Sequence, residues 1–257
     1  MKLSLFTIPM LLVACAEEVT SEAPTPEYDD TSDIPTPGDD RDEDDNDDND
    51  DNNDDNNDDN NDDNDGPVTY TFDDLDSLIY VQVWKDEDAW GSSLAHNHVV
   101  RAAEWTGTAV FDQDDVAACS FSFTIPVEDL QVDEDGMRSL VGYDDTINSS
   151  DREEIRDHML GSDQLDPSTH PYITFDVNSC SGSGSDITLN AEMEVAGGSA
   201  NVSAAIDIDV DGDRLYVSGT IDMTHSDFGM DPFEAYGGFV RNDEPLDFTF
   251  DMVGFAN

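Results

Sequence analysis

Alternation of hydrophobic and polar residues dominates the chain from residue 67 onward. In residues 187–195 and 246–253 every second position is apolar, which places one face of each segment against a core and the other in solvent. This period of two predicts β-strands, and Gly197-Gly198 and Asp211-Gly212 supply tight turns between them. The predicted strands are Leu78–Trp84, Trp105–Phe111 as part of a longer segment that starts near His96, Ala118–Pro126, Tyr172–Cys180, Ile187–Val195, Ala200–Val210, Leu215–Met223 and Leu246–Val253.

One segment departs from this alternation and predicts a short helix. Ser150 and Glu153 have the spacing of an N-terminal capping box, Ile155 and Met159 share a helical face, and Gly161 ends the segment. About eight consecutive strands with one apolar face each form either a sandwich or a closed barrel, and closure removes exposed strand edges. We therefore expect an all-β domain over residues 67–257 with one inserted short α-helix.

The inward-facing positions of these strands carry apolar side chains without a recurring charged group. They are Phe121, Phe123, Ile125, Ile173, Phe175, Val177, Leu189, Met193, Val217, Ile221, Phe248 and Phe250. Such side chains either fill a solid core or form the wall of a cavity that takes an apolar ligand by burial alone, at about 25 cal/mol per Å². The pattern leaves both alternatives open.

The first fifteen residues have the layout of an export signal. Lys2 precedes the apolar stretch Leu3–Leu12, which is too short to cross a bilayer as a helix. Leu12-Val13-Ala14-Cys15 resembles the bacterial lipobox, in which the cysteine is acylated, so we expect lipidation at Cys15. Ala16 follows the cysteine, which by resemblance to Gram-negative lipoproteins favours the outer membrane, on its periplasmic face or at the cell surface.

Residues 16–66 are expected to form a disordered acidic tether. Asp39–Asp65 contains 16 Asp and 9 Asn, and like charges without apolar residues keep a chain open. The whole chain has 63 acidic and 9 basic residues, a net charge of −54, which excludes nucleic acid as an electrostatic partner. An alternative function also follows from this tract, namely a calcium-dependent surface or interaction protein in which the barrel is a platform and Ca²⁺ associates weakly with the tract.

Two cysteines remain after Cys15. In the oxidising compartment that the signal implies, we expect a disulfide between Cys119 and Cys180, and two buried free thiols are the alternative. Cys119 shares the apolar face of its strand, whereas strict alternation puts Cys180 on the opposite face from Val177. The bond therefore requires a bulge near Asn178 or the end of the strand.

Four groups of residues have a recognisable pattern when taken together. They are Asp151–Leu160, Leu165–Phe175, His96–Val100 with Gly107, and Gly219–Met230. Together they resemble the YceI-like family of lipid- and polyisoprenoid-binding proteins, although this chain has His225 where many members have arginine. The resemblance spans about residues 75–255. It implies an extended, lipocalin-like antiparallel β-barrel that encloses a long apolar molecule such as a polyisoprenoid or an isoprenoid quinone. It implies no catalysis and no cofactor beyond the bound lipid.

Three histidines are candidate metal ligands. His96 and His98 lie on one side of a strand at the spacing of a shared metal site, and His225 adds a third imidazole from another segment. No cysteine or close acidic ligand shares the spacing, so polar contacts at the barrel mouth are the favoured interpretation and no metal is expected. His158 and His170 are interpreted as structural. Asp207–Gly212 begins like a calcium loop, but Ser218 stands at its twelfth position.

These observations favour one function over the calcium-dependent alternative. We expect an exported lipoprotein, tethered to the outer membrane, whose barrel binds an apolar lipid and could also carry it. No set of acid, base and nucleophile can be assigned roles, so an enzyme is not expected.

Overall fold

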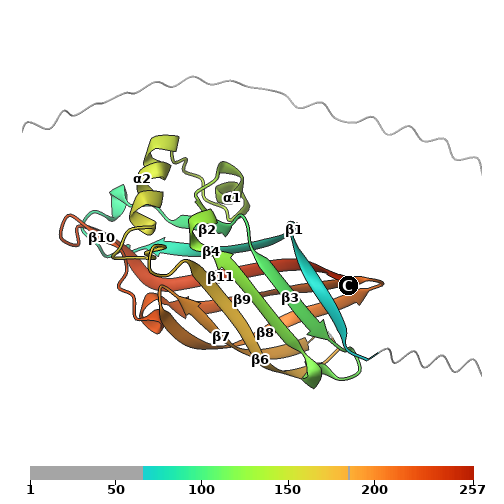
Figure 1. Ribbon diagram of the computed structural model, residues 1–257. Coiled ribbons are helices and arrows are strands. Elements are labelled where there is room, and N and C mark those ends of the chain that lie inside the picture. Colours follow the sequence, from blue (N-terminus) through green and yellow to red (C-terminus); the bar gives the residue numbers. More distant parts are fainter. Residues whose placement is uncertain (1–65, 185) are drawn as a thin grey trace, which may run out of the picture. The chain divides into compact units, whose positions relative to one another are not determined.

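The computed structural model describes residues 66–184 and 186–257, which form a closed antiparallel β-barrel (Figure 1). The predicted signal peptide, the lipidation at Cys15 and the tether up to residue 65 lie outside the described residues. The barrel strands are β1 (Val68–Lys85), β3 (Thr106–Phe111), β4 (Ser120–Pro126), β6 (Tyr172–Ser183), β7 (Asp186–Val195), β8 (Gly198–Asp211), β9 (Arg214–Thr224) and β11 (Val240–Ala256). Each pairs with the next in this order, and β11 pairs with β1 to close the barrel. The predicted all-β class, the barrel and its eight strands are confirmed.

The long strand β1 pairs with two different strands along one of its edges. Val68–Thr71 pairs with β3, whereas Tyr80–Val83 pairs with β2 (His98–Ala102), which in turn pairs with β5 (Leu130–Val132). A register shift against β11 between Asp73 and Leu78 separates the two halves. The single segment predicted from His96 to Phe111 is therefore two strands, because β2 and β3 pair with different halves of β1.

Two helices lie between β5 and β6, at one end of the barrel (Figure 1). The predicted helix is α2 (Ser149–Met159), and α1 (Asp135–Leu140) is additional to it. The predicted capping box at Ser150 is wrong. Asn148 caps α2 instead, because its extended backbone lets the side chain accept bonds from the backbone N–H groups of Ser150 and Asp151, both at 3.0 Å.

Short elements complete the described part. They are the 3-10 helices η1 (Ser92–Leu94), η2 (Val116–Ala118), η3 (Val127–Asp129) and η4 (His225–Phe228), and the two-residue strand β10 (Glu234–Ala235), which pairs with β11. Within the described residues, no helix combines the length and the apolar character needed to cross a membrane.

The alternating pattern produces a continuous apolar interior. In β7 each odd-numbered residue from Ile187 to Val195 is buried and each even-numbered one is exposed. The turn from β7 to β8 is tight, with positive φ at Ala196 and Gly197. A Cβ atom at Gly197 would lie 2.3 Å from the His170 ring, and the φ of +77° strains any residue with a side chain, so both features favour glycine there.

A disulfide joins Cys119, directly before β4, to Cys180 in β6, with the Cα atoms 5.9 Å apart. The pairing of β6 with β7 shifts between Val177 and Ser179, so Asn178 is the extra residue of a bulge. This bulge reverses the alternation and turns Cys180 into the interior, where it is buried together with Cys119.

Candidate functional site

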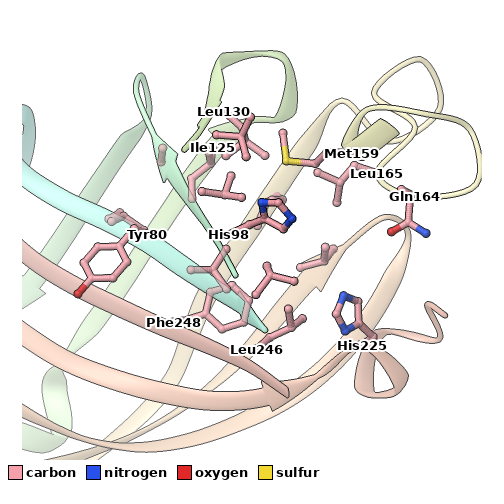
Figure 2. A pocket seen from close by; sticks show the side chains of 18 of the residues that line it. Tyr80, His98, Ile125, Leu130, Met159, Gln164, Leu165, His225, Leu246 and Phe248 are labelled. Atoms are coloured by element: carbon pink, nitrogen blue, oxygen red, sulfur yellow. The ribbon is translucent and has the colours of Figure 1, made fainter. Parts of the chain in front are cut away.

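An apolar cavity of about 210 Å³ lies inside the barrel, at the end where α2 is found (Figure 2). It is at the level where β4, β7 and β9 end and where β6 and β11 begin. Its apolar lining residues are Ile79, Val81, Val83, Val100, Ala102, Phe123, Ile125, Leu130, Val132, Ile155, Met159, Leu165, Ile173, Phe175, Met193, Val195, Ile221, Met230, Phe233, Leu246, Phe248 and Phe250.

The structure places the twelve predicted wall residues at two levels of the barrel. Those that line the cavity are Phe123, Ile125, Ile173, Phe175, Met193, Ile221, Phe248 and Phe250. The other four, Phe121, Val177, Leu189 and Val217, do not line it and are buried in the core beyond it. Their assignment to the wall is corrected, because period-two alternation identifies the inner face of a strand but not the depth along the barrel.

Aromatic packing shapes part of the cavity wall. Phe123 and Phe175 are directly paired across β4 and β6, and their rings stack with centroids 4.7 Å apart. On the facing strands, a Cβ atom at Gly219 would lie 2.9 Å from the ring of Phe250. The missing side chain at Gly219 therefore leaves room for the Phe250 ring.

Helix α2 and the loop after it cover the cavity. Ile155 and Met159, the helical stripe seen in the sequence, line it together with Leu165. In Figure 2, Met159 and Leu165 lie close to Leu130 at the edge of the same space. All of these α2 and loop side chains are only partly buried, which is expected for a cover that packs less tightly than the core.

Seven polar side chains also line the cavity: Tyr80, His98, His158, Gln164, His225, Asn242 and Thr249. Of the three histidines weighed as metal ligands, His98 and His225 thus face one cavity, whereas His96 lies outside it and contacts Asp145. His158, interpreted as structural, lines the cavity and lies 5.0 Å from the Phe233 ring.

A buried ionic network holds His98 in place. Its Nδ1 is 2.7 Å from Oδ2 of Asp133, which is fully buried. The other carboxylate oxygen of Asp133 accepts from the Val99 backbone N–H at 3.1 Å and from Arg138 Nη1 at 2.7 Å. Arg138, only 2% exposed, also donates to the carboxylate of Asp145, which contacts His96. The network therefore runs from the cavity wall to the surface.

The network keeps its carboxylates ionised. Burial by itself raises the pKa of Asp133, but the bond from His98, the Val99 N–H group and the Arg138 guanidinium together lower this pKa below its ordinary value. The pKa of Asp145 is also lowered, since the contacts with His96 and Arg138 outweigh its desolvation.

A polar depression, here named the vestibule, adjoins the cavity and shares His158, Gln164, Phe233 and Asn242 with it. Its ionisable residues other than His158 are Asp86, Asp157, Asp163, Asp231, Glu234, Arg241, Asp243 and Glu244. The one guanidinium among them, on Arg241, is bonded to Asp86. The entrance region is therefore strongly anionic.

Metal binding finds no support in the described part of the chain. No group of three or more His, Cys, Asp or Glu side chains there could hold a metal ion. Asp207–Gly212, which begins like a calcium loop, forms the end of β8 and its turn into β9. The Asp/Asn tract on which the calcium alternative depends lies outside the described residues.

The Asp133–Arg138 network and the place of Gln164 in the cavity lining were not predicted from the sequence. Arg138 could have been noticed in the sequence, because a basic residue is rare in so acidic a chain. Asp133 has a positive φ of 52°, which places it at the sharp turn after β5. Gln164 carried no signal of its own, since it lies in a loop without periodicity.

One solved structure with a similar fold agrees with this architecture, and a family profile assigns most of the chain. Among solved structures, BcnA of Burkholderia cenocepacia superimposes with a TM-score of 0.53 at 16% sequence identity, covering 71% of this chain and 98% of that one. The YCEI protein of Campylobacter jejuni gives a TM-score of 0.45 at 12% identity and covers 62% of this chain and 84% of its own. No curated protein sequence is significantly similar. Residues 85–252 match the profile of the YceI-like domain, which is most of the chain, and the protein therefore belongs to the YceI-like family.

Proposed function

We propose that this protein binds, and carries, an apolar lipid such as a polyisoprenoid or an isoprenoid quinone inside its barrel. The observation that carries the proposal is the cavity of about 210 Å³, whose wall is formed mostly by aliphatic and aromatic side chains from the strands and α2. Apolar surface transferred from water into such a wall gains about 25 cal/mol per Å². The role is one of binding, and no catalytic step is proposed.

The size of the cavity limits how a long lipid is held. Ligand pockets usually measure about 300–1,000 Å³, so a cavity of about 210 Å³ encloses only part of a long chain. The remainder leaves through the mouth, or the partly buried cover residues Met159 and Leu165 move outward to admit it. A cover of this kind suits a carrier, because the lipid must enter and leave.

The proposed setting is the outer membrane, with Cys15 as the lipid anchor and residues 16–66 as the tether. Fifty-one residues reach at most about 170–180 Å when fully extended. Such a tether allows the barrel to collect a lipid at some distance from its anchor. Labelling with a radioactive fatty acid tests this part, and its loss in Cys15→Ala is the expected result.

Mass spectrometry of a solvent extract tests the binding proposal. We expect the purified full-length chain to release a prenyl or acyl lipid in near-stoichiometric amount. The variant Met159→Trp places a larger side chain at the cavity and should release less lipid, whereas Leu140→Trp, on the exposed face of α1, should release as much as the wild type. An extract without lipid from all three folded proteins would contradict the proposal.

A further inference from the structure

The hydrogen-bonding state of His98 follows from its partner. The ionised carboxylate of Asp133 can only accept, so the Nδ1 atom of His98, 2.7 Å away, carries the proton and donates it. In the neutral imidazole, Nε2 is then an acceptor. Within residues 66–184 and 186–257 this atom has no hydrogen-bond partner, and the ring projects among the apolar side chains of the cavity (Figure 2).

His225 is fixed in the same way by a different group. Its Nδ1 is 3.1 Å from the backbone carbonyl oxygen of Glu244, which has no proton to give. Nδ1 therefore donates, and Nε2 is again an acceptor. His225 is only 5% exposed and lines the cavity from η4.

Gln164 provides a third acceptor on the loop after α2. Its Nε2 donates to the backbone carbonyl oxygen of Asp231 at 3.3 Å, which fixes the orientation of the amide. The Oε1 atom is left without a partner in the described part of the chain, and the residue lines both the cavity and the vestibule. His98, His225 and Gln164 thus come from separate elements, and each donates an N–H to an oxygen that can only accept a hydrogen bond. Each of these three side chains then has one acceptor atom left for a ligand.

The charges around the cavity disfavour ligands with an anionic head group. Among the described residues that line it there is no lysine or arginine. The vestibule beside it contains seven carboxylate side chains and one guanidinium, which is already bonded to Asp86. An anionic head group would enter this region against like charge, without a cation to pair with.

We propose that the cavity selects apolar molecules that end in an uncharged hydrogen-bond donor, such as a hydroxyl group, over molecules whose polar end only accepts hydrogen bonds or is anionic. The inference rests on the proposed function and sharpens it, since it favours a prenyl alcohol or a quinol over a quinone or a prenyl phosphate. A ligand that shields these acceptors from water without offering a donor leaves them unpaired, which weakens its binding, and this is the source of the selection.

Three ligands with the same chain test the inference on the delipidated full-length protein at about pH 8. They are farnesol, farnesyl methyl ether and farnesyl phosphate, and their dissociation constants can be measured by isothermal titration calorimetry. We expect farnesol to bind about tenfold more tightly than the ether, which lacks the donor. Farnesyl phosphate should bind more weakly than farnesol, with a gap that narrows as salt screens the carboxylates.

Substitutions test which residues cause the preference for a hydroxyl group. His225→Phe and Gln164→Met remove one acceptor each and should reduce the preference for farnesol over the ether, while the affinity for the ether is kept or improved. His98→Phe should have the same effect. It also removes a hydrogen-bond donor from the buried carboxylate of Asp133, so the folding of this variant is checked by circular dichroism. His96→Phe is the matched control, since that histidine lies outside the cavity, and it should leave the preference unchanged.

The outcomes separate this inference from the proposed function. Equal affinity for farnesol and its methyl ether, or tighter binding of the phosphate, overturns the inference and leaves lipid binding intact. Failure of all three ligands to bind, together with a lipid-free extract, overturns the proposed function itself. A preference for farnesol that survives in the three acceptor variants also counts against the inference.

Discussion

The two halves of the barrel use the same strands and the same residue types, yet one half is solid and the other is hollow. Along β4, Phe121 belongs to the solid half, whereas Phe123 and Ile125 line the cavity. Along β9 the boundary falls between Val217 and Ile221. Hydrophobicity alone therefore does not decide whether a barrel is filled.

The halves also differ in what stabilises them. The solid half contains the Cys119–Cys180 disulfide and some of the most deeply buried residues, including Ile187 and Val217. The segments around the hollow half depend on polar contacts. Of the seven basic residues in residues 66–257, all but Arg214 bond to carboxylates or carbonyls there: Lys85, Arg101, Arg138, Arg152, Arg156 and Arg241.

This difference has a physical reason. A cavity deprives its lining of packing contacts, so the loops and helices that cover it gain less from apolar burial than the strands below them. Ionic and hydrogen-bonded contacts can position such segments without filling the space. The rare basic residues of an acidic chain are concentrated where packing is weakest.

The largest expected effect is at the buried ion pair of the hollow half. Asp133→Ala removes one of the two carboxylates bonded to the buried Arg138, and with it the partner of His98 and of the Val99 N–H. We expect a loss of about 3–5 kcal/mol in the free energy of unfolding. Urea denaturation followed by fluorescence measures it. The control is Asp135→Ala, which removes an exposed partner of Arg152 and should cost less than about 1 kcal/mol. Equal losses in the two variants would show that the buried network has no special role.

In the solid half, removal of the disulfide should come next. The double variant Cys119→Ala/Cys180→Ala is expected to lose about 2–4 kcal/mol in the free energy of unfolding, because the cross-link closes a loop across 61 positions. Farnesol affinity of the folded variant should not change, since neither cysteine lines the cavity. A variant that folds with full stability but loses its ligand would contradict the division into two halves.

A single substitution type compares the two halves directly. Ile187→Ala in the solid half should cost about 2–5 kcal/mol, as expected for a fully packed site. Ile221→Ala in the cavity wall should cost about 1–2 kcal/mol less, since part of its side chain already borders empty space. Denaturant unfolding of both variants provides the difference. If Ile221→Ala proves the more costly, the cavity is filled by side chains in solution.

The sequence predicted the strands well because alternation is a direct consequence of strand geometry. It also carried the α2 stripe of Ile155 and Met159, which now line the cavity. The position of a residue along the barrel axis could not be predicted. Phe175 and Val177 both face inward with the same alternation, but only Phe175 lines the cavity. The six-residue helix α1 is too short to produce a period.

The polar part of the site was predicted least. His98 and His225 stood out as residue types, but their common cavity depends on the closure of the barrel between distant segments. The pairing of Asp133 with His98 and Arg138 depends on a turn with positive φ, which a sequence of this composition does not reveal. Local sequence patterns identify the inner face of each strand, whereas the site is formed by contacts between side chains of different strands and loops.

The smallest expected effect is the response of the hollow half to mild acid. The folded-state pKa of Asp133 is lowered, so its contribution to stability is fully present above the unfolded-state pKa of about 3.9 and is lost as the pH falls through the folded-state value. From pH 7 to about 5 this group should therefore cause no loss. Asp133→Asn removes the titrating carboxylate and leaves other acids with lowered pKa values, such as Asp86 and Asp145, in place. The difference in unfolding free energy between wild type and variant should shrink below about pH 4, where the carboxylate gains a proton. A difference that stays unchanged below about pH 4 would show that the ionised carboxylate does not stabilise the fold, and the assignment of the Nδ1 proton of His98 would lose its basis.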